Sequence, residues 1–380
     1  MLLSIPEIST VNRVTGERKN PKLILTTIIC LSLFFLFLIF QLLTVSFLRE
    51  QKSDAVPFSG SVIINPYQNS DFISHTKKSA LHLHSDSVWY TPERHTKAEI
   101  KDVYQKNGYS LLGITDYDKF GDEENGFISG YEWGRNLRKR HALGIGGKKI
   151  VSDYFPIYAR RENVNWTFKQ MQKNGSYVVV SHPKLNDSFT KEDLINIQNY
   201  NAIEVFSPFG DDTKILDTLL TSGRNVHCMS TDDLHYFAEE TIQKFEQPIW
   251  KDLLQKVLFQ RGRKGESLKR YVTTASEKIN GSDYQKALFD GAFYCVRKHF
   301  REAEDPLLPN IKLNKQNQIQ LTSNERYMEI RWIGKGGEFR QIDSSTNEAV
   351  FQMSENDPYI RLEIITLSGV IISNAIYRQN

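Results

Sequence analysis

Residues 81–86 have the sequence Leu-His-Leu-His-Ser-Asp, and the fold and chemistry predicted for the whole chain follow from them. The apolar residues around them predict a strand, and side chains two apart on a strand point to the same face. His82 and His84 therefore present two imidazoles together, with the carboxylate of Asp86 just beyond. Such groups are ligands for a transition metal. A lone His-x-His pair is more often structural, so further ligands must come from other strands.

Short apolar runs alternate with helical patterns after this stretch. The expected strands are residues 80–84, 110–114, 126–132, 141–145, 177–181, 202–206 and 225–230. Helical patterns cover 95–108, 165–175 and 212–223, and each ends in glycine, the usual helix stop. This alternation predicts an α/β barrel or open sheet with parallel strands. Residues 240–300 have a mostly helical pattern, and 283–298 fit a helix followed by a short strand.

Metal-competent side chains fall at or near the ends of nearly all these strands, where active sites of barrels and open α/β sheets converge. They are His82, His84, Asp86, Asp116, Glu132, His141, His182, Glu204, Asp232, Asp233 and His235. His141 fits this rule least well, because it lies at the start of its strand. Neutral imidazoles with carboxylates suit Zn²⁺, Mn²⁺ or Fe. The sequence therefore predicts a transition-metal site built from several strands.

The ordered motifs LHLH, GITDYD, GYEW, HALGIG, VVVSHP, AIEVF and STDDLH resemble the polymerase and histidinol phosphatase (PHP) domain, over about residues 78–300. ALFDGAFY and the C-terminal YIRLEIITLSGVIISNAIY further resemble the CehA-like branch, which carries a terminal β-domain. The resemblance implies an α/β fold with a distorted (β/α)7 PHP barrel and a cluster of two or three divalent metal ions.

The resemblance also implies a role for each ligand. His82, His84 and Asp233 would bind one ion, Glu132 would bridge to a second ion held by His141 and His182, and His235 would serve a third. A bridging carboxylate can hold two ions about 3.5–4 Å apart, and a hydroxide shared by them can attack a substrate. Glu132 and Asp233 are the expected catalytic residues, with Asp233 or a nearby acid moving the proton.

Two departures from the family pattern concern the third ion. Tyr117 stands where the family has the histidine of Thr-Asp-His, and the loop after His84 is shortened. Asp86, Asp116 or His95 could compensate, and otherwise the centre holds two ions, with Tyr117 contacting substrate or packing. Asp116 and Asp232 are expected to orient histidines, and Glu204 is expected to support a ligand. Candidates for substrate contact are Arg94, Lys139, Arg140 and Lys184, with plain surface charge as the alternative for each.

The function predicted from this set is a metal-dependent hydrolase, with a preference for phosphoesters that comes from the resemblance alone. A degenerate PHP domain that binds a ligand or partner without turnover is one alternative. A metal-dependent ester or amide hydrolase is another, since the same cluster supports it. A small-molecule or envelope-derived ester is the expected substrate. The formal net charge of +3 gives no reason to expect nucleic acid.

The N-terminal region predicts one membrane anchor. No charged residue occurs in residues 23–48, a run long enough to span a bilayer and too long for a cleaved signal peptide. Arg13, Arg18, Lys19 and Lys22 precede it, against Arg49 and Lys52 after it. The positive-inside rule then places residues 1–22 in the cytoplasm and the large domain outside it, in the periplasm, a lumen or the extracellular space.

The remaining segments complete the expected organisation. Residues 49–76 have the polar composition of a linker, 77–304 the barrel pattern, and 305–380 alternating strands typical of a small antiparallel β-sandwich. Cys228 and Cys295 are the two cysteines outside the apolar run, and are expected as buried thiols or, alternatively, as one disulfide. Sequons at Asn165, Asn174, Asn186 and Asn280 matter only in a glycosylating host.

Overall fold

The computed structural model describes residues 21–47, 55–237, 250, 267–275 and 281–380, except positions 92, 94, 122, 124 and 125. The chain divides into two units, Met1–Phe47 and Leu48–Asn380, and each is treated separately below.

The described part of the first unit is one apolar helix, α1 (Pro21–Phe47). Its stretch Pro21–Gln41 is long and apolar enough to cross a bilayer, and most of its side chains are exposed. A helix so apolar around its whole circumference is not suited to a soluble surface. By length and composition α1 can be a membrane span, although an N-terminal signal sequence meets the same criteria.

In the second unit, all the strands expected between residues 80 and 230 are present. They are β2 (Thr76–Leu83), β3 (Tyr109–Ile114), β4 (Phe127–Ile128), β5 (Gly130–Trp133), β6 (Ala142–Ile145), β7 (Tyr177–Val180), β8 (Ala202–Phe206) and β9 (His227–Ser230). The expected helices are α2 (Lys97–Lys106), α3 (Arg161–Lys173) and α5 (Thr213–Thr221), and a short α4 (Lys191–Asn196) follows β7. Thr96 and Glu99 form a capping box that fixes the start of α2.

Strand direction differs from the parallel arrangement that the sequence predicted. β2–β3, β3–β4, β7–β8 and β8–β9 are parallel, whereas β6 runs antiparallel to both β5 and β7. Only residues 134–141 connect β5 to β6, which is too short for a parallel crossover. Gly134 begins this turn with φ +119°, and a Cβ there would lie 2.0 Å from the carbonyl oxygen of Arg140. The reversal has a direct consequence for His141: the start of β6 lies at the same edge as the ends of β5 and β7.

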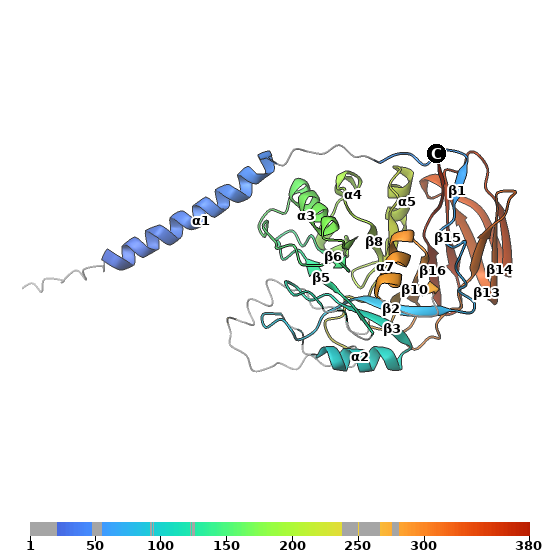
Figure 1. The fold of residues 1–380 in the computed structure, drawn as a ribbon, viewed down its shortest axis with the longest axis horizontal. Helices are drawn as coiled ribbons and strands as arrows, with labels where there is room; N and C mark the ends of the chain where they lie inside the picture. Colours follow the sequence, from blue (N-terminus) through green and yellow to red (C-terminus); the bar gives the residue numbers. More distant parts are fainter. Residues whose placement is uncertain are drawn as a thin grey trace, which may run out of the picture. The chain divides into compact units, whose positions relative to one another are not determined.

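Three isolated bridges connect two sheets, one of them between Gly121 and Gly130. β5-β6-β7-β8-β9 form a five-stranded sheet, whereas β2, β3 and β4 belong to a twelve-stranded one. Leu83 at the end of β2 bridges to Leu234 beyond β9, and Tyr117 beyond β3 bridges to Glu132 in β5. The pairings therefore link β2, β3, β5, β6, β7, β8 and β9 in a ring that isolated bridges close. In Figure 1, α2 lies beside β3 of this ring.

The C-terminal strands continue the larger sheet. β10 (Arg270–Ala275) pairs with β2, and β11 (Phe293–Lys298) follows α7 (Gly281–Asp290) and pairs with β10. The helical pattern expected up to residue 300 is wrong for β10, where the β-branched residues Val272, Thr273 and Thr274 lie in a buried strand. The rest are β12 (Asn310–Leu313), β13 (Gln318–Ile333), β14 (Phe339–Gln352), β15 (Tyr359–Ile365), β16 (Gly369–Ser373) and β17 (Ile376–Gln379). All their pairings are antiparallel, as expected, but β16 also pairs with β11, which joins them to the predicted barrel region.

The predicted linker is packed in its described part. β1 (Val62–Ile64) pairs with β17, and Tyr67 and Phe72 are buried against Tyr294 of β11. The Tyr67 hydroxyl donates to the carbonyl oxygen of Phe293. The prediction of a free tether is therefore wrong from β1 onward, because two aromatic side chains in this polar segment are placed in the core.

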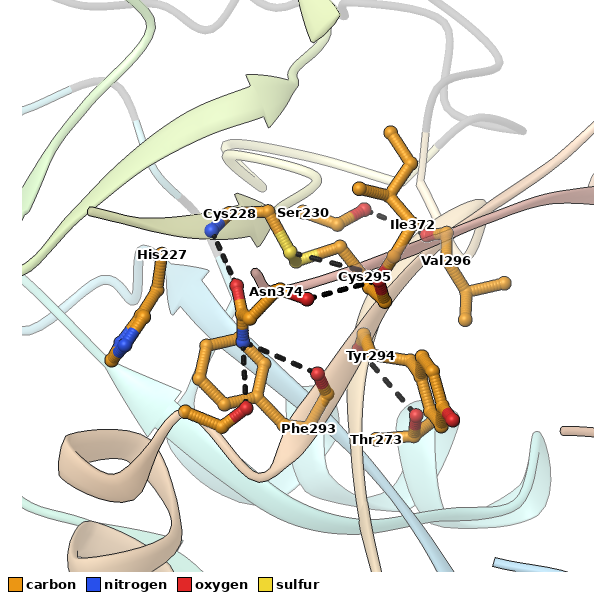
Figure 2. Close-up of a disulfide and its surroundings, with 12 residues drawn as sticks. His227, Cys228, Ser230, Thr273, Phe293, Tyr294, Cys295, Val296, Ile372 and Asn374 are labelled. Carbon is orange, nitrogen blue, oxygen red and sulfur yellow. Dashed lines mark hydrogen bonds between the residues drawn. A yellow bond between two sulfur atoms is a disulfide. The ribbon is translucent and has the colours of Figure 1, made fainter. Parts of the chain in front are cut away.

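Cys228 and Cys295 form a disulfide between β9 and β11, with their Cα atoms 6.3 Å apart. Figure 2 shows the bridge beside Asn374, whose side chain accepts from the Cys228 backbone and donates to the carbonyl oxygens of Gly291 and Phe293. The expectation of two buried thiols is corrected to the alternative of one bridge. The disulfide joins the strand that leads to Asp232, Asp233 and His235 to the larger sheet.

Candidate metal centre

The structure brings the seven predicted metal ligands together. They form four overlapping groups: His82 with His84 and Glu132, His82 with His182 and Asp233, His84 with Asp233 and His235, and Glu132 with His141 and His182. All seven side chains are buried. They come from the ends of β2, β5, β7 and β9 and from the start of β6, so the reversed direction of β6 is what brings His141 into the cluster.

Glu132 lies between two sets of imidazoles, one on each carboxylate oxygen. Its Oε2 is 3.2 Å from His84 Nε2 and 3.5 Å from His82 Nε2. Its Oε1 is 3.0 Å from His141 Nδ1 and 3.3 Å from His182 Nε2. A carboxylate arranged in this way can bridge two cations.

Asp233 supplies the second carboxylate of the cluster. Its Oδ1 lies 3.1 Å from His82 Nε2, 3.2 Å from His84 Nε2 and 3.3 Å from His235 Nε2. Its Oδ2 is 3.7 Å from His182 Nε2, which also faces Glu132. The backbone of Asp233 has φ +44°, an uncommon conformation for a non-glycine residue that is often found at functional sites.

The arrangement fits a bound metal better than a set of hydrogen bonds. Four atoms of the cluster are buried without a hydrogen-bond partner: His82 Nε2, His84 Nε2, Glu132 Oε2 and Asp233 Oδ1. Each of the two imidazole nitrogens lies 3.1–3.5 Å from each of the two carboxylate oxygens. Ligand atoms about 2.1 Å from a tetrahedral ion lie roughly 3.4 Å apart. Buried polar atoms without partners are rare unless they bind an ion or water.

The charges of the cluster favour a cation in the same place. Burial alone would raise the pKa of the Glu132 carboxyl, but His141 and His82 hold that pKa well below its usual value. Burial likewise opposes ionisation of Asp233, and His82 and His235 lower its pKa well below the usual value. Burial disfavours a proton on His82, yet Asp233 and Glu132 raise its pKa well above normal. Two ionised carboxylates thus attract positive charge, which a divalent ion supplies as well as protons do.

Glu204 has the supporting position that the sequence predicted. Its Oε1 lies 2.8 Å from His82 Nδ1 and accepts from Thr231 Oγ1, while its Oε2 accepts from the His182 backbone N–H. A carboxylate at Nδ1 fixes the imidazole tautomer and leaves Nε2 for the metal.

The other predicted supporting acids divide into two cases. Asp116 accepts from the Ser85 backbone and hydroxyl and is 3.9 Å from His84 Nδ1, so it lies beside a ligand. Asp232 instead accepts from the backbone N–H groups of Leu268 and Arg270. Its predicted role of orienting a histidine is therefore wrong in this structure, since its carboxylate faces the segment leading into β10.

Tyr117 lies within the cluster although it cannot replace a histidine as a neutral metal ligand. Its hydroxyl is 3.3 Å from His141 Nδ1, and its ring stacks on His84 with centroids 5.2 Å apart. Asp86 is exposed, and His95 packs on Phe237 with centroids 4.7 Å apart. Neither belongs to a metal-competent group among the described residues, so neither compensates for the missing histidine there.

Of the four predicted substrate contacts, the structure contradicts Arg140 and leaves Lys139 and Lys184 untested. Arg140 is buried, and its guanidinium pairs with Asp193 and donates to the carbonyl oxygens of Ser188 and Ala159, so it supports the fold. Lys184 is partly exposed and donates to the carbonyl oxygen of Asp211. Lys139 has φ +56°, and burial lowers its pKa. Arg94 lies outside the described residues.

Glu93 is an acidic residue beside this cluster that was not among the predicted site residues. Glu93 Oε1 lies 2.5 Å from His235 Nδ1, and both side chains are buried. The sequence signal was only a glutamate in the segment TPERH, between a predicted strand and a predicted helix. Nothing in that local pattern distinguishes it from an exposed loop residue.

The chain is similar to several solved structures, and two of these matches, both at low sequence identity, are as follows. A two-domain protein from Bacteroides vulgatus ATCC 8482, described as containing a predicted PHP-like metal-dependent phosphoesterase, has a TM-score of 0.42 and 14% identity, over 83% of this chain and 100% of its own. PsfC from Pseudomonas syringae PB-5123 has a TM-score of 0.36 and 13% identity, over 55% and 88%. No protein-family model and no curated protein sequence matches the chain. Neither match tests the CehA-like branch.

Proposed function

We propose that this chain is a metal-dependent hydrolase of the PHP type, CehA-like in its C-terminal strands, and that its substrate is a phosphoester. The main support for this proposal is the position of Glu132, whose two carboxylate oxygens face two separate sets of buried imidazoles. Two ions fit this arrangement: one among His82, His84, Glu132 and Asp233, the other among Glu132, His141 and His182. Zinc, manganese or iron suits these donors.

Bound divalent ions would supply an acidified water and neutralise charge that develops on a phosphoryl oxygen. The chain's own residues have separate tasks. Glu132 and Asp233 hold the centre together, and Asp233, whose Oδ2 is 3.7 Å from His182, is the group placed to take and return a proton. Glu204 keeps the His82 proton on Nδ1. The Tyr117 hydroxyl, at 3.3 Å from His141, can donate to a substrate oxygen.

The proposed location is a membrane, with α1 as an anchor and the second unit outside the cytoplasm. The cations before α1 support this orientation. The disulfide supports it too, since structural disulfides persist mainly in oxidising compartments. The substrate would then be a small or envelope-derived ester. Protease added outside intact cells should degrade the second unit, and protection of that unit would reverse the orientation.

One observation favours a second candidate, a PHP domain that binds a ligand without turnover. Tyr117 occupies the position of a family histidine, and Asp86 and His95 do not replace it. A centre changed in this corner could bind metal and ligand yet lack one catalytic group. The two candidates share a metal centre and differ in turnover.

The test uses the full chain purified in detergent. Bound metals are counted by elemental analysis, and hydrolysis of generic phosphomonoesters, phosphodiesters and carboxylic esters is measured. We expect about two ions per chain, with phosphoester turnover that is lost in Glu132→Gln and His84→Ala. Exposed Glu355→Gln is the matched control for charge. Full metal occupancy without any turnover would favour the binding module, and a folded protein without metal would exclude every metal-dependent candidate.

A further inference from the structure

Glu93 is buried against the metal centre although it belongs to the loop between β2 and α2. Its side chain is 1% exposed, and its Oε1 is 2.5 Å from His235 Nδ1. Burial of an ionised carboxylate is costly unless a partner compensates for the lost water. The imidazole of His235 is that partner, since its Nδ1 lies at hydrogen-bond distance from Glu93 Oε1.

His235 is held from three directions. Glu93 contacts its Nδ1, and its ring stacks on the ring of His84 with centroids 4.6 Å apart and planes at 6°. Its Nε2 is 3.3 Å from Asp233 Oδ1. The ring can therefore direct only Nε2 toward the cluster while Nδ1 stays on Glu93.

His82 shows the same arrangement on the other side of Asp233. Its Nδ1 lies 2.8 Å from Glu204 Oε1, and its Nε2 lies 3.1 Å from the same Asp233 oxygen. Two imidazoles that face Asp233 Oδ1 are thus each supported from behind by a buried glutamate. His84, the third, has only Asp116 at 3.9 Å from its Nδ1.

We propose that Glu93 is a positioning residue that makes His235 a metal ligand. Its Oε1 accepts a hydrogen bond from the Nδ1–H of His235. The lone pair on His235 Nε2 then faces the ion that Asp233 also holds. The inference rests on the proposed metal centre and adds a residue to it. A carboxylate behind a ligand imidazole fixes both its tautomer and its ring orientation, and losing such a partner typically lowers metal affinity about 10–100-fold.

The test measures Co²⁺ binding to the full chain in detergent, by chelator competition and by the visible absorption of the bound ion. We expect Glu93→Leu to weaken the affinity of one Co²⁺ by about 10–100-fold and to change the absorption band, because the ion loses a fixed ligand. Glu93→Gln keeps an acceptor oxygen and should lie between Glu93→Leu and the unaltered protein. Glu204→Gln is the positive comparison, and Glu355→Gln the control that should change neither readout.

A double-mutant cycle separates positioning from a general structural effect. If Glu93 acts through His235, then His235→Ala and Glu93→Leu together should weaken Co²⁺ binding no more than His235→Ala alone. Unchanged affinity and absorption in Glu93→Leu, or additive losses in the cycle, would overturn the inference. Should Glu93→Leu fail to fold, Glu93→Gln carries the same cycle. Failure of the unaltered protein to bind Co²⁺ would instead overturn the proposed metal centre itself, and this inference with it.

Discussion

Removing the Cys228–Cys295 disulfide should cost much of the stability of the second unit. The bridge joins residues 67 apart in sequence, and both side chains are fully buried. On the chain-entropy account, closing a loop of this length in the unfolded chain is worth about 4 kcal/mol at 25 °C. We therefore expect Cys228→Ala and Cys295→Ala each to lower the free energy of unfolding by roughly that amount, plus a smaller loss of packing.

The assay is urea unfolding of the full chain in detergent, with and without reductant. Because either substitution breaks the same bridge, the double variant should be only slightly less stable than each single variant. Cys30→Ala, in α1, should leave unfolding of the second unit unchanged, and free-thiol labelling under denaturing conditions should find only Cys30 in the unaltered protein. Reductant should destabilise the unaltered protein but none of the variants that lack the bridge.

Two results would refute this reasoning. Additive losses from the two single substitutions would mean that the sulfurs contribute separately, as buried thiols do. Labelling of three thiols in protein isolated from its native membrane would mean that the bridge does not form there. The second result would also remove the disulfide as support for a location outside the cytoplasm.

Three further predictions concern single side chains. Tyr117→Phe removes the hydroxyl that lies 3.3 Å from His141 Nδ1 but keeps the ring stacked on His84. Bound metal should therefore be retained while kcat for a phosphoester falls. Equal loss of metal and activity would instead assign Tyr117 to the metal ligands. Arg361→Met leaves Asp217 buried without its ion-pair partner, which lies 2.6 Å away. It should lower the free energy of unfolding in urea by about 3–5 kcal/mol. The double variant Arg361→Met with Asp217→Leu should lose little, because no unpaired charge remains. Burial lowers the pKa of His227 to about 4. As the pH falls, this imidazole therefore takes up a proton in the unfolded chain before it does so in the folded chain. The free energy of unfolding should drop by about 3 kcal/mol between pH 6.5 and 4. His227→Asn should flatten that pH dependence, and an unchanged slope would contradict the assignment.

The sequence was sufficient for most of the strands and helices up to residue 230 and for the residues that cluster in the candidate centre, because both depend on short patterns. Alternating apolar residues place β2 and β9, and His82, Glu132 and Asp233 follow from strand ends. The direction of each strand, and so the edge of the sheet at which its ligands lie, was less predictable. His141 looked misplaced until the short connection from β5 reversed β6, since strand direction depends on the path of the whole connection.

Long-range partners were the main omission. Arg140 looked like a surface cation, but Asp193, 53 residues away, pairs with it in the interior. The pairing of β16 with β11 joins segments that the composition separated at residue 305. Glu93 carries no local signal of burial, because its partner His235 lies 142 residues later. Each of these features is decided by contacts between distant parts of the chain, which no local pattern encodes.

Closure of the fold and assembly of the metal centre involve the same residues. Leu83, which bridges to Leu234, lies between His82 and His84, and Leu234 lies between Asp233 and His235. A second bridge joins Tyr117 directly to Glu132. Closing the two sheets therefore buries Glu132 and Asp233, whose desolvation is costly unless cations compensate for it. Ions bound among the imidazoles would offset that cost at the place where isolated bridges join the two sheets, so metal binding would add stability to this junction.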